Sequence, residues 1–296
     1  MALNLLGMKA IPLKTRPENG FMPSVDVCRT LIGLKTKAIV LVTPNNPTGA
    51  TYSPALIAAF ATLAREKSIA LIIDETYRDF IITGSPPHML FSSSTAPHLW
   101  RSTFIHLFSF SKLYCLPGHR LGAIVASPQL LASIKPILDT LQICAPRPIQ
   151  FALAPLLPSL RSFITDTAKQ LHSRHALFKA SLPHRWCVGA QGGYFAFVRH
   201  PFPRVKVEEV SKRLAEELGV ITLPSIFFAQ EAQQEVDADV DMDVLAVDRA
   251  VSEQAREVEE DDRWIRFSVA NVDDEKVKNV CERLSESESV FGWTLE

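Results

Sequence analysis

Short apolar runs separated by helix-like segments constrain the fold of this chain more than any other feature of its sequence. The runs are rich in strand-forming residues and do not alternate with polar ones, which is typical of strands buried on both faces of a sheet. We predict strands over the runs MKAIPLK, KAIVLV, IALIIDE, TFIHLFSF and GAIVAS, at residues 8–14, 37–42, 69–75, 103–110 and 122–127. Strands that alternate with helices favour a mostly parallel sheet built from right-handed crossovers.

Helix signals lie between and after these runs. The segment SPALIAAFATLAREKS (residues 53–68) has Ser53 as a candidate N-cap and Pro54 at the first helical position. A longer helical region begins at Pro128 and continues, with proline interruptions, to about Ala180.

The pattern changes beyond residue 180. We predict a hairpin, an amphipathic helix, a strand and a closing helix, at residues 186–200, 207–219, 264–271 and 273–287. We therefore expect an α/β large domain in residues 1–178, with a mostly parallel sheet flanked by helices, and a smaller C-terminal α+β domain in residues 179–296.

Composition excludes several classes of protein. Lys and Arg number 31 against 32 Asp and Glu, so no global basic field points to nucleic acid. The five cysteines are scattered without CxxC spacing, which argues against a disulfide framework and fits a reducing compartment. No apolar run is long enough for a signal peptide or a membrane span. We expect a soluble cytoplasmic protein with no nucleic-acid or membrane partner.

An acidic segment interrupts the predicted small domain. Residues 231–262 hold thirteen acidic side chains against Arg249 and Arg256. This composition predicts a solvated surface insertion. A metal site or a dock for a basic partner is the alternative, but no EF-hand spacing supports a metal site.

Four polar clusters fall at or near the ends of predicted strands, where open α/β sheets bind ligands. They are TPNNPTG (residues 43–49), Asp74 with Tyr77, the group Ser109, Ser111, Lys112 and Arg120, and Arg266. Each has an ordinary structural explanation when taken alone, as a turn, a cap or an ion pair. Placing a lysine after a buried apolar strand costs free energy, however, unless its amine forms a covalent bond or an ion pair.

Taken together and in this order, the clusters resemble the cofactor site of the fold-type I pyridoxal-phosphate enzymes, specifically the class I/II aminotransferases. The motifs are NNPTG, then D-x-x-Y, then S-x-S-K followed by an arginine eight residues later, then a late R-x-S. The step of 28 residues from Asn46 to Asp74 also fits, and the QGGYFAF hairpin resembles the family's small-domain G-x-F segment. The resemblance covers nearly the whole chain apart from the acidic segment.

The resemblance implies pyridoxal 5'-phosphate as the cofactor and assigns roles around its ring. Lys112 would form a Schiff base with the cofactor aldehyde and then move a proton from the substrate's Cα. Asp74 would pair with the pyridine nitrogen and keep it protonated. Tyr77 and Asn46 would hydrogen-bond the phenolic oxygen of the ring.

The same resemblance implies how the phosphate and the substrate are held. Arg120, with Ser109 and Ser111, would grip the phosphate, and Arg266 would bind the substrate's α-carboxylate in a bidentate pair. The substrates would be an amino acid and a 2-oxo acid. Family active sites sit at a subunit interface, so we also expect a homodimer.

The chain departs from the family pattern at its start. Members carry a longer N-terminal part with a small-residue phosphate loop and an aromatic that stacks on the ring, so we expect a large domain shortened at the N-terminus. Two alternatives to an aminotransferase stay open. One is a lyase, decarboxylase or substitution enzyme on the same scaffold. The other is a non-catalytic, truncated paralogue that acts as a partner subunit.

Three residues near the lysine are not assigned to the site. His106 lies in the strand before Lys112, and we expect it to be a core or sheet residue. His119 is expected at the surface, and nothing near Cys115 marks it as a nucleophile.

Overall fold

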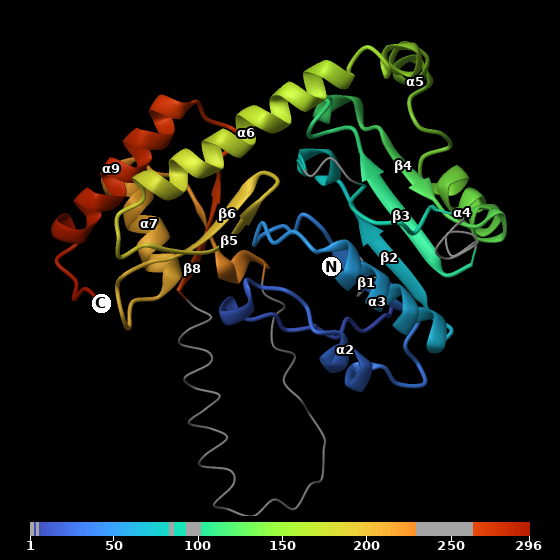
Figure 1. Ribbon diagram of the computed structural model, residues 1–296, viewed down its shortest axis with the longest axis horizontal. Coiled ribbons are helices and arrows are strands. Elements are labelled where there is room, and N and C mark those ends of the chain that lie inside the picture. Colours follow the sequence, from blue (N-terminus) through green and yellow to red (C-terminus); the bar gives the residue numbers. More distant parts are fainter. Residues whose placement is uncertain (1–2, 4–5, 83–85, 93–101, 229–262) are drawn as a thin grey trace, which may run out of the picture. The chain divides into compact units, whose positions relative to one another are not determined.

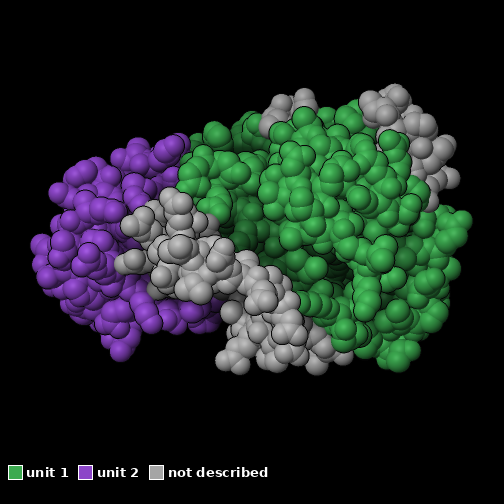
Figure 2. All heavy atoms as spheres, turned by 90° about the horizontal axis from the view of Figure 1, so that it is seen from below, with its two compact units in different colours: residues 1–173, 191–194 green, residues 174–190, 195–296 purple. Residues whose placement is uncertain are grey.

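The chain folds as two compact units in the computed structural model, which describes residues 3, 6–82, 86–92, 102–228 and 263–296. Unit 1 comprises residues 1–173 and 191–194, and unit 2 comprises residues 174–190 and 195–296 (Figure 2). The division after Ser173 and the boundary expected after residue 178 both fall in helix α6 (Arg161–Ser181). The acidic segment at residues 231–262 lies outside the described residues.

Unit 1 is built on sheet A, whose strands follow one another in chain order (Figure 1). Its described strands are β1 (Ala38–Val42), β2 (Ala70–Asp74), β3 (Phe104–Ser109) and β4 (Gly122–Val125). Strands β1, β2 and β3 pair in parallel, and β4 is antiparallel to β3. The register aligns Val42, Asp74 and Leu107, so the chain leaves the three parallel strands at one carboxyl edge.

Helix α3 (Pro54–Glu66) begins and packs as its sequence predicts. The Ser53 hydroxyl accepts a hydrogen bond from the backbone N–H of Leu56 at 3.2 Å, which caps the helix. Its buried side chains recur at helical spacing: Ile57, Phe60, Ala61, Leu63 and Ala64. The helix packs on β2 and on the short helix α2 (Val25–Leu31).

The part of unit 1 that contains β4 and the two helices after it exposes many large apolar side chains. No residue of α4 (Pro128–Leu141) is buried, all four residues of β4 are exposed, and the short helix α5 (Arg147–Leu153) buries only Leu153. Large apolar side chains exposed here are Ile124, Val125, Leu131, Ile137, Leu138, Leu141, Ile143 and Phe151. We call this surface the β4–α4 face.

Two strand predictions need correction. Residues 8–14 form no strand: the run contains Pro12, which lacks an N–H, and pairs with no described strand. The run at residues 122–127 does form β4, but as an exposed antiparallel strand and not one buried on both faces. The other three predicted strands of sheet A form, although β1 is not buried on both faces, since Val40 is 57% exposed.

Unit 2 is built on sheet B, with strand order β5-β6-β8-β7 among the described residues. The strands are β5 (Cys187–Gly192), β6 (Phe195–Arg199), β7 (Leu223–Pro224) and β8 (Trp264–Ser268). Strand β8 is antiparallel to both β6 and β7. The helices α7 (Val207–Leu218) and α9 (Asp274–Val290) complete the unit with the C-terminal part of α6.

Short 3-10 helices connect the larger elements. They are η1 (Pro17–Asn19), η2 (Arg78–Phe80), η4 (Pro117–His119), η5 (Ala154–Leu156) and η6 (Ser225–Phe228). Within the described ranges, none of the helices combines the length and the apolar composition that a membrane crossing requires.

Candidate active site

The side chain of Asn45 helps to hold the shape of the loop after β1, at residues 43–49. The Asn45 Oδ1 accepts hydrogen bonds from the backbone N–H of Thr48 at 3.2 Å and from its hydroxyl at 2.9 Å. The Asn45 amide also donates to the carbonyl oxygen of Val42 at 3.3 Å, which ties the loop to β1. Asn46, the predicted ring ligand, is exposed beside this turn. The loop therefore presents Asn46 at the carboxyl edge of sheet A.

Asp74 ends β2 with one carboxylate oxygen engaged. Its Oδ1 accepts hydrogen bonds from the backbone N–H of Thr76 at 2.9 Å and from the Thr76 hydroxyl at 2.7 Å. No described residue donates to Oδ2. A carboxylate has about four lone-pair sites on its two oxygens, so Oδ2 retains the capacity to accept an N–H from a ligand.

Lys112 lies in the turn that follows β3. Ser109 ends the strand, and its hydroxyl accepts a hydrogen bond from the Ser111 N–H at 3.2 Å. The Lys112 carbonyl accepts from the N–H of Cys115 at 3.0 Å, which closes the turn. The lysine side chain is half-buried, and its amine makes no hydrogen bond or ion pair with the described residues. Since β2 and β3 are parallel neighbours, Asp74 and the Lys112 turn share the carboxyl edge.

Arg120 follows η4 and is exposed. Its backbone is left-handed, with φ 51°, and its Nη1 donates to the carbonyl oxygen of Pro117 at 2.9 Å. That bond uses one of the five N–H groups of the guanidinium fork. His119 is exposed, as its sequence position predicts, and Cys115 is exposed as well.

Tyr194 contacts the lysine turn and was not predicted as a site residue. Its hydroxyl donates to the Lys112 carbonyl oxygen at 3.1 Å, and the Lys112 Nζ lies 5.8 Å from its ring centroid. The ring centroid lies 5.4 Å from that of Tyr77 and 5.0 Å from that of Phe80. Burial, with a smaller effect of the charge of Cys115, raises the pKa of Tyr194 to about 12. The hydroxyl therefore keeps the proton that it donates.

Two glycines allow Tyr194 to lie there. It follows Gly192, which ends β5, and Gly193, which lies with it in the turn before β6; residues 191–194 belong to unit 1. A Cβ at Gly192 would collide with the carbonyl oxygen of Gly49 and come within 2.8 Å of the Thr51 hydroxyl. Only residues without a side chain permit this approach to the loop after β1. The Gly-Gly-Tyr sequence was the one local signal for this contact.

A buried ionic cluster, also unpredicted, lies next to the site in the sequence. Glu75 directly follows Asp74 and is fully buried. Its Oε2 lies 2.8 Å from His106 Nε2, 2.9 Å from His88 Nε2 and 3.0 Å from Arg78 Nη1. Burial raises the pKa of Glu75, but hydrogen bonds to both histidines and the charges of His88 and Arg78 outweigh it and lower the pKa to about 2.

The cluster accounts for His106, which is confirmed as a buried residue of the sheet. Within the described ranges, no three His, Cys, Asp or Glu side chains are arranged to hold a metal ion. The arrangement is therefore an ion-pair cluster around one buried carboxylate. An acid that ends a buried apolar run, with a histidine, His106, in the next run along the chain, was the available signal.

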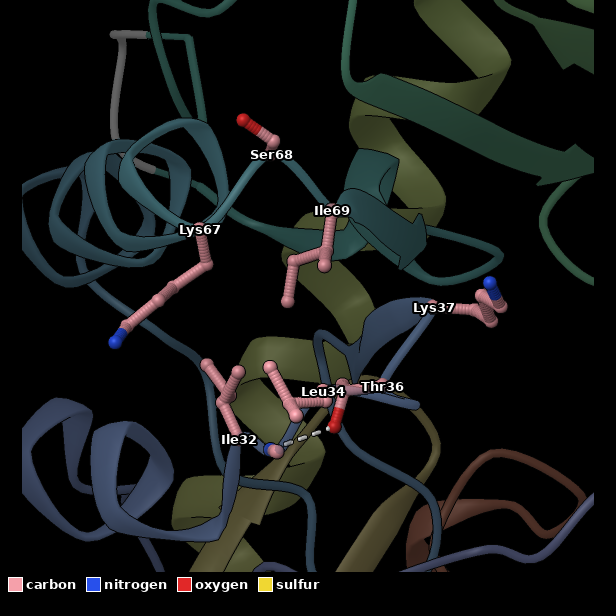
Figure 3. A pocket seen from close by; sticks show the side chains of 8 residues that line it. Ile32, Leu34, Thr36, Lys37, Lys67, Ser68 and Ile69 are labelled. Atoms are coloured by element: carbon pink, nitrogen blue, oxygen red, sulfur yellow. Dashed lines mark hydrogen bonds between the residues drawn. The ribbon is translucent and has the colours of Figure 1, made fainter.

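A separate hollow of about 520 Å³ lies at the amino edge of sheet A, before β1 and β2 begin (Figure 3). The side chains of Ile32, Leu34 and Ile69 point toward one another across it, while Lys37 points away. Asp74 and the Lys112 turn lie at the opposite edge, so this hollow takes no part in the candidate site.

Arg266 belongs to unit 2, where it lies on β8 opposite Phe197 and Leu223. Its guanidinium carbon lies 4.4 Å from the ring centroid of Phe195 and 4.7 Å from that of Phe228. These distances are typical of cation–π contacts. Within unit 1, the structure groups Lys112 with Tyr194 and Tyr77; Arg266 is held in its own unit by aromatic rings.

The fold and the site together define a class of protein. Polar side chains at the carboxyl edge of a mostly parallel sheet are typical of an α/β protein that binds a small ligand there. The chain belongs to the class I and II aminotransferase family: the family model described as "Aminotransferase class I and II" matches residues 1–284.

Relatives support this membership. The aspartate aminotransferase of Sulfurisphaera tokodaii is 29% identical over 232 residues, which are 75% of this chain and 56% of the relative. The glutamate-pyruvate aminotransferase AlaA of Haemophilus influenzae is 29% identical over 218 residues, which are 70% of this chain and 52% of the relative. The chain therefore spans about half the length of these curated relatives.

A solved structure confirms the predicted fold class. A PLP-dependent aminotransferase from Streptococcus suis matches with a TM-score of 0.74 at 22% identity, covering 96% of this chain and 65% of that one. At this level of identity the likeness concerns the fold. It includes both the mostly parallel sheet with its helices and the smaller α+β part.

Proposed function

We propose that the chain acts as a pyridoxal-phosphate-dependent aminotransferase, which moves an amino group between an amino acid and a 2-oxo acid, with Lys112 as the residue that bonds to the cofactor. One observation carries the proposal. Lys112 is half-buried at the carboxyl edge of sheet A, beside the strand that ends in Asp74, and its amine makes no hydrogen bond or ion pair with the described residues. Family membership supports the same chemistry.

The residues of unit 1 fit the ring of this cofactor. Asp74 Oδ2, which no described residue engages, would accept the N–H of the pyridine ring. Asn46 and Tyr77 would hydrogen-bond the phenolic oxygen. A carboxylate at this position favours a positively charged ring nitrogen, since opposite charges a few ångströms apart stabilise each other.

The phosphate would be held by three residues beyond β3. The guanidinium of Arg120 keeps N–H groups beyond the one bonded to Pro117, and its fork matches two phosphate oxygens. The Ser109 hydroxyl accepts from Ser111, so its own proton is available to a phosphate oxygen. Ser111 would add a second hydroxyl.

The cofactor and the residues of the chain would contribute different parts of the chemistry at the substrate. When bound, pyridoxal phosphate supplies an electron sink that stabilises negative charge at the substrate's Cα. The Lys112 amine would take the proton from Cα and return it to complete the transfer. Arg266 would bind the substrate's α-carboxylate through two parallel hydrogen bonds and so fix the orientation of the Cα–H bond.

Two further predictions of the resemblance belong to this proposal. A homodimer follows from the family's interfacial active sites. A cytoplasmic location is supported by the five cysteines, all of which are free in the structure.

Visible absorbance tests the proposal. Purified protein with added pyridoxal phosphate should show a pH-sensitive band that Lys112→Ala lacks and Lys37→Ala, a control at an exposed strand end, retains. Adding amino acids should then deplete the band. A wild-type spectrum identical to that of free cofactor would contradict the proposal.

Arg266 has its own test. Arg266→Ala should raise the KM for amino acids by about 10-fold or more while leaving cofactor affinity within about 2-fold, because the lost bonds are to substrate alone. Equal losses in both quantities would show that Arg266 does not bind the carboxylate.

A further inference from the structure

Tyr194 touches Lys112 at both ends of the lysine. Its hydroxyl donates to the lysine's carbonyl oxygen at 3.1 Å, and its ring centroid lies 5.8 Å from the lysine's Nζ. Both residues belong to unit 1, although 82 positions separate them in the chain. A cation within about 6 Å of a ring centroid is attracted by the negative face of the ring. One side chain therefore contacts both the backbone and the amine of the same residue.

We propose that Tyr194 is a positioning residue for Lys112: its hydroxyl fixes the backbone of the lysine turn, and its ring face holds the amine at the carboxyl edge until a ligand binds. The role deepens the proposed function, since it gives Lys112 a defined resting position there. Tyr194 itself makes and breaks no bond.

A ring suits this task better than a carboxylate would. An acid beside the amine would form an ion pair that a reacting aldehyde must break, whereas a ring face attracts the amine without forming a hydrogen bond to it. The Lys112 amine makes no ion pair or hydrogen bond with any described residue, and its cation–π contact is with the Tyr194 ring. The amine is thus held without being chemically occupied.

The ring is itself held from several sides. It packs on Tyr77 at 5.4 Å and edge-on to Phe80 at 5.0 Å between centroids. The preceding residue, Gly193, has φ 53°, and a Cβ there would lie 3.2 Å from the Cβ atoms of both Pro44 and Tyr77. The position of the amine therefore depends on the loop after β1 and on Tyr77 as well as on its own turn.

Nuclear magnetic resonance of the protein without cofactor tests the amine contact directly. Reductive methylation with ¹³C-formaldehyde labels lysine amines, and the Lys112 signal is the one lost in Lys112→Arg. We expect this signal to be shifted upfield by the Tyr194 ring. Tyr194→Leu should move it to the position of solvent-exposed lysines, and Tyr194→Phe should leave it upfield.

A second readout follows the backbone contact and does not need the leucine variant to fold. The N–H of Cys115 donates to the same Lys112 carbonyl at 3.0 Å. Loss of the tyrosine hydroxyl in Tyr194→Phe should speed hydrogen exchange of that N–H by roughly 3- to 10-fold. Tyr114→Phe is the matched control, because the Tyr114 hydroxyl makes no hydrogen bond among the described residues and should change neither readout.

The loaded protein supplies a third readout. Visible circular dichroism per bound cofactor reports how firmly the chromophore is oriented, and it should fall in Tyr194→Leu but not in Tyr114→Phe. An unshifted Lys112 signal in the wild type, or unchanged exchange at Cys115 in Tyr194→Phe, would overturn the positioning role. The proposed function fails separately, by the absence of any cofactor band in a wild type whose amine signal is shifted.

Discussion

Helix α7 in unit 2 buries a stripe of four apolar side chains (Val207, Val210, Leu214 and Leu218), whereas the slightly longer α4 in unit 1 buries none. The strands differ in the same way: four of the five residues of β6 are buried, and all four residues of β4 are exposed. In unit 2, both the sheet and the helix contribute buried side chains to a core. Unit 1 builds a core around β1 to β3 and leaves the β4–α4 face bare, in a chain that spans about half the length of its relatives.

The units also differ in how they bury ionisable groups. Unit 1 keeps the carboxylate of Glu75 ionised among histidines and an arginine. Unit 2 keeps His200 neutral: burial, followed by the charges of Arg263 and Arg199, lowers the pKa of His200 to about 3. Only the charged cluster adjoins a candidate site, which suggests that the ionic network also supports the strand that ends in Asp74.

Removal of the buried carboxylate should have the largest effect. Glu75→Ala should lower the free energy of unfolding by about 3–5 kcal/mol, because it leaves Arg78 and two histidines without their common partner. Urea unfolding followed by far-ultraviolet circular dichroism measures the change. The control is Glu66→Ala in the exposed pair with Arg29, which should cost under about 1 kcal/mol. Equal losses of unfolding free energy in the two variants would mean that the buried Glu75 cluster stabilises the protein no more than a surface ion pair does.

A matched pair of leucines tests the difference in burial. Leu214→Ala on α7 should cost about 2–5 kcal/mol because it removes a fully buried side chain. Leu138→Ala on α4, where the side chain is 44% exposed, should cost within about 0.5 kcal/mol. A large cost at Leu138 in the same urea titration would show that the β4–α4 face is covered in solution.

The turn that carries Tyr194 should be sensitive to a single methyl group. Gly193→Ala should cost about 1–2 kcal/mol, because φ 53° is a left-handed conformation and the new Cβ would crowd Tyr77. The comparison variant is Gly33→Ala, whose Cβ meets nothing within 4 Å and whose cost should stay within about 0.5 kcal/mol. Similar values for the two would mean that the turn is not tightly held.

The two units should respond to acid in different ranges. The pKa of His200 is 6.5 in the unfolded chain and about 3 in the folded one. As the pH falls, the unfolded state therefore binds the proton first, and the stability decreases below about pH 6.5. By pH 5.5 the loss is roughly 1 kcal/mol. The pKa of Glu75 is about 2 in the folded protein and 4.5 in the unfolded chain. Its ionised carboxylate therefore stabilises the fold fully above about pH 4.5, and this stability is lost as the pH falls toward 2.

Tryptophan fluorescence reports mainly on unit 2, because three of the four tryptophans of the chain, Trp186, Trp264 and Trp293, lie in that unit. Urea midpoints recorded by fluorescence should decrease between pH 6.5 and 5.5, and His200→Gln should flatten that dependence. An unchanged slope in the variant would assign the acid response to other groups.

The sequence predicted the parts of the molecule that local patterns determine. Strands β1 to β3 and helix α3 follow from continuous apolar runs, a serine cap and a proline at the first helical position. The strand predicted at residues 8–14 was wrong because a strand needs a paired neighbour, and an apolar run does not reveal whether one exists. The exposure of β4 was missed for a different reason: the strand does pair with β3, but an apolar run does not reveal whether other elements cover its faces.

The residues of the candidate site also differ in whether local sequence patterns could identify them. Motif spacing identified Asp74, Tyr77, Lys112, Arg120 and Arg266 as candidates, and their roles stay predictions. Tyr194 and the Glu75 cluster were missed because their contacts join residues far apart in the chain. A tyrosine after two glycines and an acid after a buried run are common in many proteins, and only the tertiary structure shows which lysine or histidine lies beside them.

Chemical trapping tests the central claim most directly. Protein loaded with pyridoxal phosphate is reduced with borohydride, digested and mapped by mass spectrometry. The account predicts a pyridoxyl-phosphate mass on the peptide that contains Lys112, lost in Lys112→Ala and undiminished in Lys67→Ala. The same mass confined to other lysines, with Lys112 unmodified, would contradict it.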